Sequence, residues 1–449
     1  MTAPSLPPGP STPRALQTLR WIARPTAMLE DCQRRFGDMF TLKIANEGDW
    51  VFLSHPDAVK QVFTGDPRLL HAGEGNVILL PVLGSHSVLL LDEAAHMSQR
   101  KLLLPPFHGE RMRGYAETMR EVAEEAVGQW PLDKPFGVWK SMQAITLEVI
   151  MRTVFGVEDE VRRVPLRDAI TDALHRGISA RQLGLVTVLG PERLAKARWY
   201  QRTFDRSDRL IYEEIALRRE APDLAEREDI LSLLLAARHE DGSPMSDVEL
   251  RDELMTLLIA GHETTASSLA WAVERLVRHP EMLERLREEA AAGEDEYLDA
   301  VIKETLRLRP ILSLVLRRLT EPMEIGGRLL PAGVNVAPAI HLMHRRPEVY
   351  PEPLRFRPER FLEGQGGTYT WIPFGGGVRR CLGASFAQFE MKIVLQEVVK
   401  RLDLRPADAR PEPRVRRAIT LVPGRGGEVV AAPLERTPAV PVAERAAAA

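Results

Sequence analysis

A glycine-rich loop that contains one cysteine is the most chemically suggestive stretch of this chain. Residues 374–383 read FGGGVRRCLG, so Cys381 lies among four glycines and two arginines. Nearby cations and the backbone N–H groups at the start of a helix stabilise a thiolate, and the following segment, 383–402, has the pattern of a helix. Cys381 is therefore placed to be an anion.

A glycine-rich loop with one cysteine could serve three kinds of chemistry. A phosphate-binding loop is excluded, because no Gly-Lys-Ser/Thr follows the glycines. A catalytic nucleophile would need a partner histidine, which the sequence leaves open. The third kind is a ligand of a metal centre, such as iron.

The segment AGHETT at 260–265 is a second candidate site. Its His-Glu pair invites comparison with the HExxH zinc motif, but Ala266 stands where the second histidine is required. Thr264 can bond back to a carbonyl of its own helix and locally distort it. Read alone, the segment indicates a core helix with one polar notch.

Charged pairs at helical spacing form a third group of motifs. Glu304 and Arg307 in KETLRLRP are three residues apart, and His96 and Arg100 in HMSQRK are four apart. Each pair therefore shares one helix face. Read alone, an isolated Glu-x-x-Arg is more often an exposed ion pair than a special one.

The cysteine loop matches the pattern FxxGxRxCxG and resembles the haem-binding loop of the cytochrome P450 family. The five fixed positions are Phe374, Gly377, Arg379, Cys381 and Gly383. The resemblance implies that Cys381 is the thiolate ligand of haem b, that Arg379 pairs with a haem propionate and that Phe374 packs beside the sulfur. The glycines would let backbone N–H groups face the sulfur.

The central segment also resembles the family, through its oxygen-activation pattern [AG]Gx[DE]T. The resemblance implies that the small residues Ala260 and Gly261 let haem and O2 lie against the helix. It also implies that Glu263 and Thr264 relay protons to dioxygen.

The charged pairs match two further family motifs. Glu304 and Arg307 resemble the buried ExxR pair, and Arg360 in FRPERF would complete a three-member ion network, as in the family. His96 and Arg100 resemble a propionate-binding HxxxR. Arg317 falls where the family often carries another propionate arginine, although the adjacent Arg318 leaves the register open. The resemblance spans roughly residues 20–430, with the motifs in the family's order.

The function implied by this resemblance is that of a haem-thiolate monooxygenase. It would insert one oxygen atom from O2 into a lipophilic substrate, by hydroxylation or epoxidation. The sequence has no GxGxxG fingerprint and no iron–sulfur cysteine cluster, so electrons are expected from separate chains, usually a ferredoxin and ferredoxin reductase. A peroxygenase or isomerase, and a non-catalytic haem protein, are the alternatives. The presence of Glu263 and Thr264 argues against the former.

Helices must position most of these residues. Apolar periodicity predicts helices over much of 92–310, and the longest begins after a capping box formed by Ser246 and Glu249 and ends before Pro280. That helix would span about 50 Å and cross the molecule. Strand-like runs lie at 40–45, 50–54 and 324–337. We expect a mainly α fold with minor β, a single large cytochrome P450-type fold with the long helix over the haem.

The composition indicates a globular protein without a nucleic-acid partner. Of the 449 residues, 44% are hydrophobic and 27% charged, and the net charge of -3 gives no electrostatic footprint of a nucleic-acid binder. The two cysteines cannot form a disulfide framework, and Cys32 is expected to be structural. The sequence shows no membrane anchor and no secretory signal, so a cytoplasmic location is expected.

The ends of the chain differ in composition from its body. Prolines crowd the first residues, and alanine and proline dominate the last. We expect a flexible N-terminus (1–20), a haem-thiolate monooxygenase domain (21–432) and a flexible C-terminal tail (433–449). Apolar segments that could line a substrate pocket lie at 76–90, 169–190, 311–316 and 418–423.

Overall fold

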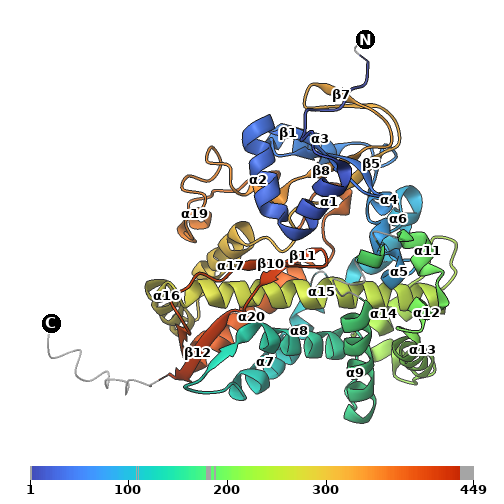
Figure 1. Cartoon of the computed structure of the whole chain (residues 1–449). Helices are drawn as coiled ribbons and strands as arrows, with labels where there is room; N and C mark the ends of the chain where they lie inside the picture. The colour runs from blue at the N-terminus through green and yellow to red at the C-terminus, as the bar shows by residue number, and fades with distance from the viewer. Residues whose placement is uncertain (1–2, 108, 110, 178–183, 187–188, 435–449) are drawn as a thin grey trace.

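Helices dominate the structure, a computed structural model that describes residues 3–107, 109, 111–177, 184–186 and 189–434 (Figure 1). The longer described helices are α1 (Arg14–Ala23), α2 (Pro25–Phe36), α3 (Pro56–Thr64), α6 (Glu93–Leu103), α7 (Arg111–Gly128), α8 (Val138–Thr153), α9 (Glu160–Gly177), α13 (Asp205–Arg219), α14 (Ile230–Ala236), α15 (Asp247–Leu276), α16 (Pro280–Ala292), α17 (Glu296–Leu308) and α20 (Ala384–Arg401). The short helical turns are α4 (Ala72–Gly75), η1 (Val77–Leu79), α5 (Leu80–Leu83), η2 (Pro105–Phe107), α11 (Pro191–Ala195), α12 (Arg198–Gln201), η3 (Leu224–Glu226), α18 (Ile340–Met343), α19 (Glu359–Leu362) and η4 (Gly377–Arg379). The predicted mainly α fold is confirmed.

The strands form small sheets. The described strands are β1 (Met39–Ile44), β2 (Gly48–Leu53), β3 (Leu70–His71), β4 (Pro135–Gly137), β5 (Arg317–Leu319), β6 (Met323–Ile325), β7 (Arg328–Leu330), β8 (Asn335–Pro338), β9 (Leu402–Pro406), β10 (Arg414–Arg417), β11 (Thr420–Pro423) and β12 (Glu428–Pro433). The largest sheet has the order β1-β2-β8-β5-β3, and its β2–β8 pair is parallel. The strand-like runs predicted near the N-terminus correspond to β1 and β2.

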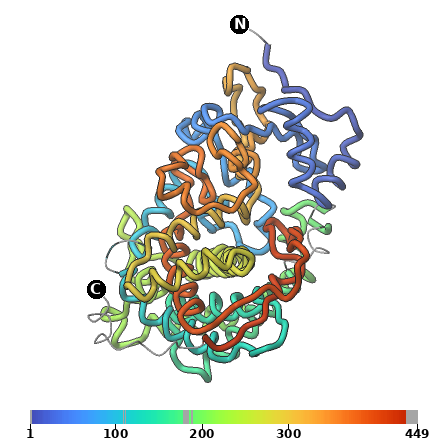
Figure 2. Tube along the Cα trace, turned by 90° about the vertical axis from the view of Figure 1, so that its left-hand side faces the viewer, coloured from blue at the N-terminus to red at the C-terminus, as the bar shows by residue number. Residues whose placement is uncertain are grey.

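The long helix predicted from the sequence is α15. Ser246 accepts a hydrogen bond from the backbone N–H of Glu249, whose carboxylate accepts one in return, so the capping box is present. The helix runs through the middle of the molecule in both views, with α7 and α8 on one side and the N-terminal sheet on the other (Figures 1 and 2). Most of its residues are buried, as expected for a helix that is apolar on nearly all sides.

The proline-rich segment before α1 lies against the first sheet. Thr41 donates a backbone hydrogen bond to the Pro8 carbonyl, and Gln17 reaches back to the Pro10 carbonyl. A Cβ at Gly9 would lie 2.0 Å from the Thr41 carbonyl oxygen, so only glycine allows this close approach. Sequence composition predicts flexibility here, but it carries no information about these long-range backbone contacts. Of the predicted tail, residues 435–449 lie outside the described residues.

Among the described residues, no helix is both long enough and apolar enough to cross a membrane.

Candidate functional site

The cysteine loop leads into α20 and is closed by hydrogen bonds around the thiol. The backbone N–H of Cys381 donates to the Phe374 carbonyl over 3.0 Å. The backbone N–H of Gly383 donates to the Cys381 sulfur. Phe374 itself is half-buried against Trp371, with ring centroids 6.0 Å apart. The loop thus directs one backbone donor, the Gly383 N–H, to the sulfur.

Two glycines fix the path of this loop past α3. Gly377 has a φ of +66°, and a Cβ there would lie 1.9 Å from the Phe63 carbonyl oxygen. A Cβ at Gly376 would lie 2.3 Å from the Phe63 ring. Gly383, in contrast, has an ordinary negative φ, and a Cβ there would have no described protein atom within 4 Å. The glycines at 376 and 377 therefore serve backbone packing against α3.

Cys381 lies in a recess inside the molecule. Its side chain has solvent-accessible surface, yet burial raises the pKa of its thiol above the ordinary value. The Gly383 N–H, Arg100 and Arg380 act in the opposite direction, because each favours the thiolate. An accessible atom that is still surrounded by protein is the arrangement expected for a ligand-binding recess.

Four of the predicted site residues form a cationic cluster beside the loop, which we call the first cluster: His96, Arg100, Arg317 and Arg379. Burial, followed by the charges of Arg379, Arg100 and Arg317, lowers the pKa of His96 to about 3, so this imidazole is neutral. Burial also lowers the pKa of Arg317 to about 10. The described residues place one carboxylate, Asp92, in this cluster, at 2.5 Å from Arg379.

The arginines of the first cluster differ in their partners. Arg379 binds Asp92 and the carbonyls of Val88 and Leu91, so it ties the segment before α6 to the cysteine loop. Arg317 is buried, and within the described residues its side chain makes one hydrogen bond, to the carbonyl of the adjacent Leu316. Its neighbour Arg318 points elsewhere, toward Glu74 at 3.3 Å.

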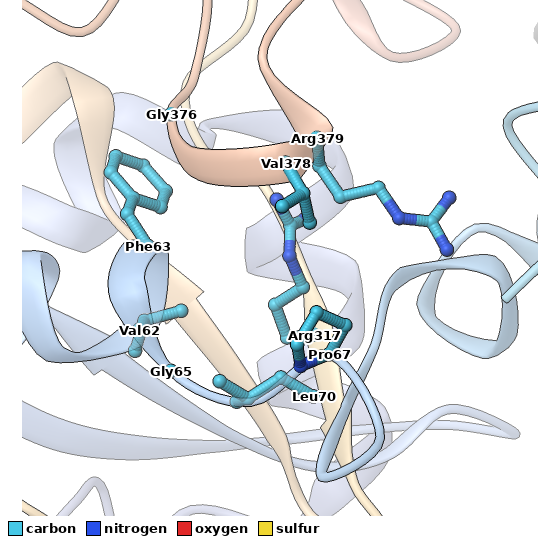
Figure 3. Close-up of a pocket in the computed structure, with 9 residues that line it drawn as sticks. All are labelled: Val62, Phe63, Gly65, Pro67, Leu70, Arg317, Gly376, Val378 and Arg379. Carbon is cyan, nitrogen blue, oxygen red and sulfur yellow. The ribbon is translucent and has the colours of Figure 1, made fainter. Parts of the chain in front are cut away.

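Figure 3 shows a small recess between α3 and the cysteine loop. Arg317 and Arg379 both line it. Arg317 extends toward Val378 of the loop, whereas the Arg379 guanidinium points away from Phe63. The structure thus assigns the register that the sequence left open: Arg317, not Arg318, faces the cysteine loop.

The structure brings together the three members of the predicted ion network. Arg307 binds Glu304 with two hydrogen bonds of 2.6 and 2.8 Å, and Arg360 binds the same carboxylate at 3.2 Å. All three side chains are completely buried. Arg307 also donates to the carbonyls of His344 and Pro353, so the remaining N–H groups are paired. The network holds together the chain between α17 and the cysteine loop.

His344 links that network to the cysteine loop, a role that no sequence motif indicates. Its Nδ1 donates to the Arg307 carbonyl over 3.2 Å, and its Nε2 accepts a 2.9 Å hydrogen bond from the backbone N–H of Ile372. Burial, and then the charge of Arg307, lowers the pKa of His344 well below the ordinary value. The neutral ring is therefore able to accept the Ile372 hydrogen bond.

The polar notch on α15 is open although the helix is otherwise buried. Ala260 is exposed, while Gly261 and Thr264 are half-buried. The Thr264 hydroxyl donates to the Ala260 carbonyl one turn earlier, and the helix continues without a break from Asp247 to Leu276. This part of α15 therefore borders a space that other protein side chains do not fill.

Glu263 points toward the strands β10 and β11. Its carboxylate accepts a 3.0 Å hydrogen bond from the Thr420 hydroxyl and lies 3.6 Å from Arg417. Burial raises the pKa of Glu263, although Arg417 and Thr420 oppose this shift. The adjacent His262 instead contacts Thr146 at 2.9 Å, and burial lowers its pKa to about 4. The sequence could not identify Thr420, which lies 157 residues away from Glu263.

A family profile described as "Cytochrome P450" matches residues 7–428 of this chain. The chain belongs to the cytochrome P450 family. A protein of Mycobacterium tuberculosis named "Putative cytochrome P450 135B1" is 44% identical over 432 residues, which cover 94% of this chain and 91% of the relative. Another from the same organism, "Putative cytochrome P450 135A1", is 40% identical over 436 residues, or 96% of each chain.

A solved structure supports the same assignment for this cytochrome P450. The structure titled "Retinoic acid bound cyanobacterial CYP120A1" is 25% identical, has a TM-score of 0.84 and covers 96% of this chain and 100% of its own. The predicted family and fold are confirmed. Members of the family are haem-thiolate monooxygenases that generally receive electrons from redox partners, so this cytochrome P450 is an oxidoreductase with a haem cofactor.

The described residues of this cytochrome P450 fit a haem. No group of three or more His, Cys, Asp or Glu side chains within the described ranges could hold a metal ion, so a ligand set of zinc type is absent there. Cys381 offers a single accessible sulfur with a backbone donor, as a haem-thiolate centre requires. The first cluster has more cations than carboxylates, which suits a cofactor with two carboxylates of its own.

Proposed function

We propose that this cytochrome P450 inserts one oxygen atom from O2 into a lipophilic substrate, by hydroxylation or epoxidation. Haem b would be the cofactor, and a ferredoxin with its reductase would supply the electrons. The observation that carries the proposal is the exposed Ala260 in the middle of the buried helix α15, next to Glu263 and Thr264. In a helix that protein side chains pack on all sides, Ala260 would be covered by its neighbours.

Residues of the cysteine loop, of α6 and of β5 would hold the cofactor. In the proposal Cys381 binds the iron as a thiolate, and Arg100, Arg317 and His96 hold the haem carboxylates. Arg379 adds its charge and keeps the segment ending at Asp92 in place. When bound, haem supplies the iron at which O2 is reduced by electrons from separate proteins.

Protons reach the site through α15. The Thr264 hydroxyl lies at the open part of the helix, where its single O–H can rotate away from the Ala260 carbonyl and donate to an oxygen atom instead. The carboxyl of Glu263 has a raised pKa, which makes proton exchange near neutral pH easier than for an exposed glutamate. The small size of Ala260 and Gly261 would let haem and O2 lie against the helix.

The apolar character of nearby segments supports a lipophilic substrate. Apolar side chains in η1 and α5 keep accessible surface instead of packing fully: Val77, Ile78, Leu79, Leu80 and Val82. Leu314 and Val315, just before β5, are half-buried as well. Such surfaces bind apolar ligands with few polar contacts. Of the candidate pocket segment 169–190, residues 178–183 and 187–188 lie outside the described residues.

A turnover experiment tests the reaction class. The purified holoenzyme is supplied with a surrogate ferredoxin, its reductase and NADPH, with and without O2. We expect an oxygenated product that requires both the electron donors and O2. Product formation from hydrogen peroxide alone, at the same rate, would instead indicate a peroxygenase, and an unoxidised rearranged product would indicate an isomerase.

The substrate class has a separate test. A library of fatty acids, terpenoids, steroids and macrolide-like compounds is screened for the change in iron spin state that follows displacement of bound water. We expect hits among uncharged or singly charged lipophilic compounds. A screen in which only small, strongly polar compounds shift the spectrum would contradict a lipophilic pocket.

A further inference from the structure

A second cluster of buried cations lies away from the haem site, where the C-terminal end of α17 meets α2, α18 and β10. We define the second cluster as Arg309, His341, Arg345 and Arg414. Arg345 and His341 are almost or completely buried, with side-chain exposures of 9% and 0%. Arg309 and Arg414 are half-buried, so solutes can reach the cluster.

The guanidinium groups of this cluster outnumber its carboxylates. His341 contacts Glu30 at 2.8 Å, and Arg345 lies 3.8 Å from the same carboxylate. Glu274, the other acidic group near Arg309, is already bound by Arg275 and Arg278 at 2.5 and 2.6 Å. Within the described residues, Arg309 and Arg414 therefore have no carboxylate of their own.

The histidine in the cluster does not add charge. Burial, with the charges of Arg345, Arg414 and Arg309, lowers the pKa of His341 well below its ordinary value. A neutral ring explains both contacts, because Nε2–H donates to Glu30 while Nδ1 accepts from Arg414 at 3.4 Å. Arg414 is thus held in place by a neutral partner that does not balance its charge.

One buried N–H donor in the cluster is also left over. The Nε atoms of Arg309 and Arg345 both lack a hydrogen-bond partner among the described residues, but Arg345 Nε faces the Glu30 carboxylate at 3.8 Å, whereas Arg309 has no ion pair with any described residue. Arg309 lies over the Trp271 ring at 4.9 Å, which orients the guanidinium but satisfies no N–H. Buried donors without partners are costly, and each indicates a missing acceptor.

The first cluster has a similar excess of buried arginines over carboxylates and can be compared with the second. In the proposed function the two haem carboxylates would balance the arginines of the first cluster. The second cluster belongs to other elements than the haem site: its residues follow α17, lie in or just after α18 and lie on β10, whereas the first cluster lies on α6, β5 and the cysteine loop.

We propose that the second cluster is a binding site for a small oxyanion, a phosphate or carboxylate group. Arg309 and Arg414 would contribute the binding charges, and the unpaired Arg309 Nε–H would donate a further hydrogen bond. Arginine is well suited to this role, because its planar fork matches the geometry of both groups.

The test measures anion binding to the holoenzyme by calorimetry and by thermal unfolding at constant ionic strength. Inorganic phosphate, acetate and chloride are compared in wild type and in Arg309→Gln, Arg414→Gln and Arg405→Gln. The last is the matched control, since Arg405 is exposed on β9 and loses the same charge. A ferrous-CO spectrum of each variant confirms that haem is retained, so that failure at this site is separate from failure at the haem site.

We expect phosphate or acetate to bind saturably, with an affinity reduced at least about tenfold in Arg309→Gln and Arg414→Gln and unchanged in Arg405→Gln. Phosphate binding without acetate binding would identify a phosphate site, and the reverse a carboxylate site. The proposal is overturned if neither anion binds wild type, if chloride has the same effect as both, or if the control variant loses binding equally.

Discussion

The Thr420 hydroxyl donates a 3.0 Å hydrogen bond to the carboxylate of Glu263, joining the β10–β11 hairpin to the central helix. Glu263 lies beside Thr264, so the hairpin helps to set the protonation of the acidic group in the proposed proton relay. Burial raises the pKa of Glu263, and Thr420 and Arg417 restrain that rise.

Replacing Thr420 by valine should therefore raise the pKa of Glu263 further. The acid-side midpoint of the pH profile for product formed per NADPH consumed should move up by roughly half to one pH unit, because a hydrogen bond to a charged group contributes on the order of 1 kcal/mol. Thr153→Val is the control, since that buried hydroxyl bonds to the Val149 carbonyl instead. An unchanged profile in Thr420→Val would rule out control of Glu263 by the hairpin.

Gly377→Ala should disrupt the cysteine loop. The new methyl group would clash with the Phe63 carbonyl, and the positive φ disfavours any side chain. We expect the purified variant to contain much less haem than wild type, as measured by the ratio of Soret to protein absorbance. Gly128→Ala, at a position with open space and an unremarkable φ, should keep full haem content. Equal haem content in the two variants would show that the loop can move away from α3.

Arg307→Ala should unfold far more easily than wild type. It leaves the buried Glu304 with a single remaining arginine and removes five hydrogen bonds, so the free energy of unfolding should fall by about 3 to 5 kcal/mol. Arg120→Ala breaks an exposed ion pair with Glu117 and should cost less than about 1 kcal/mol. Urea unfolding followed by circular dichroism measures both. Similar losses in the two variants would contradict the importance of burial.

His344 should make folding sensitive to acid. Its pKa is lowered in the folded state, so below its ordinary value of about 6.5 the unfolded chain binds a proton that the folded chain does not, and stability falls as the pH falls. This contribution approaches about 1.4 kcal/mol per pH unit and should be absent in His344→Gln. Unfolding free energies between pH 5 and 7.5 test this, with the exposed His55→Gln as the control. Parallel pH curves for wild type and His344→Gln would refute it.

Local patterns in the sequence were enough to predict the family, the helical fold and α15 with its capping box, and the resemblance to the family implied the grouping of Glu304, Arg307 and Arg360. Each of these depends on residues that are close in sequence or on a motif with fixed spacing. The partners that the sequence did not reveal are distant ones: Thr420 for Glu263, His344 for Ile372, and Asp92 for Arg379. No periodicity connects such residues, because the fold alone brings them together.

The sequence also could not decide which of Arg317 and Arg318 faces the cysteine loop. Arg317 and Arg318 are equivalent as letters, and only the alternation of side chains along β5 decides that the first is buried and the second pairs with Glu74. The packed N-terminal segment is a similar case. Its prolines suggest flexibility, but its backbone contacts with β1 depend on where the first sheet lies.

The ligand role of Cys381 is the centre of this account, and one spectrum tests it most directly. The reduced, CO-bound protein should show the red-shifted Soret band of a thiolate ligand, and Cys381→Ser should lose that band while the circular dichroism of the helices is kept. A Cys381→Ser protein that still shows the red-shifted band would contradict the assignment of Cys381 as the iron ligand.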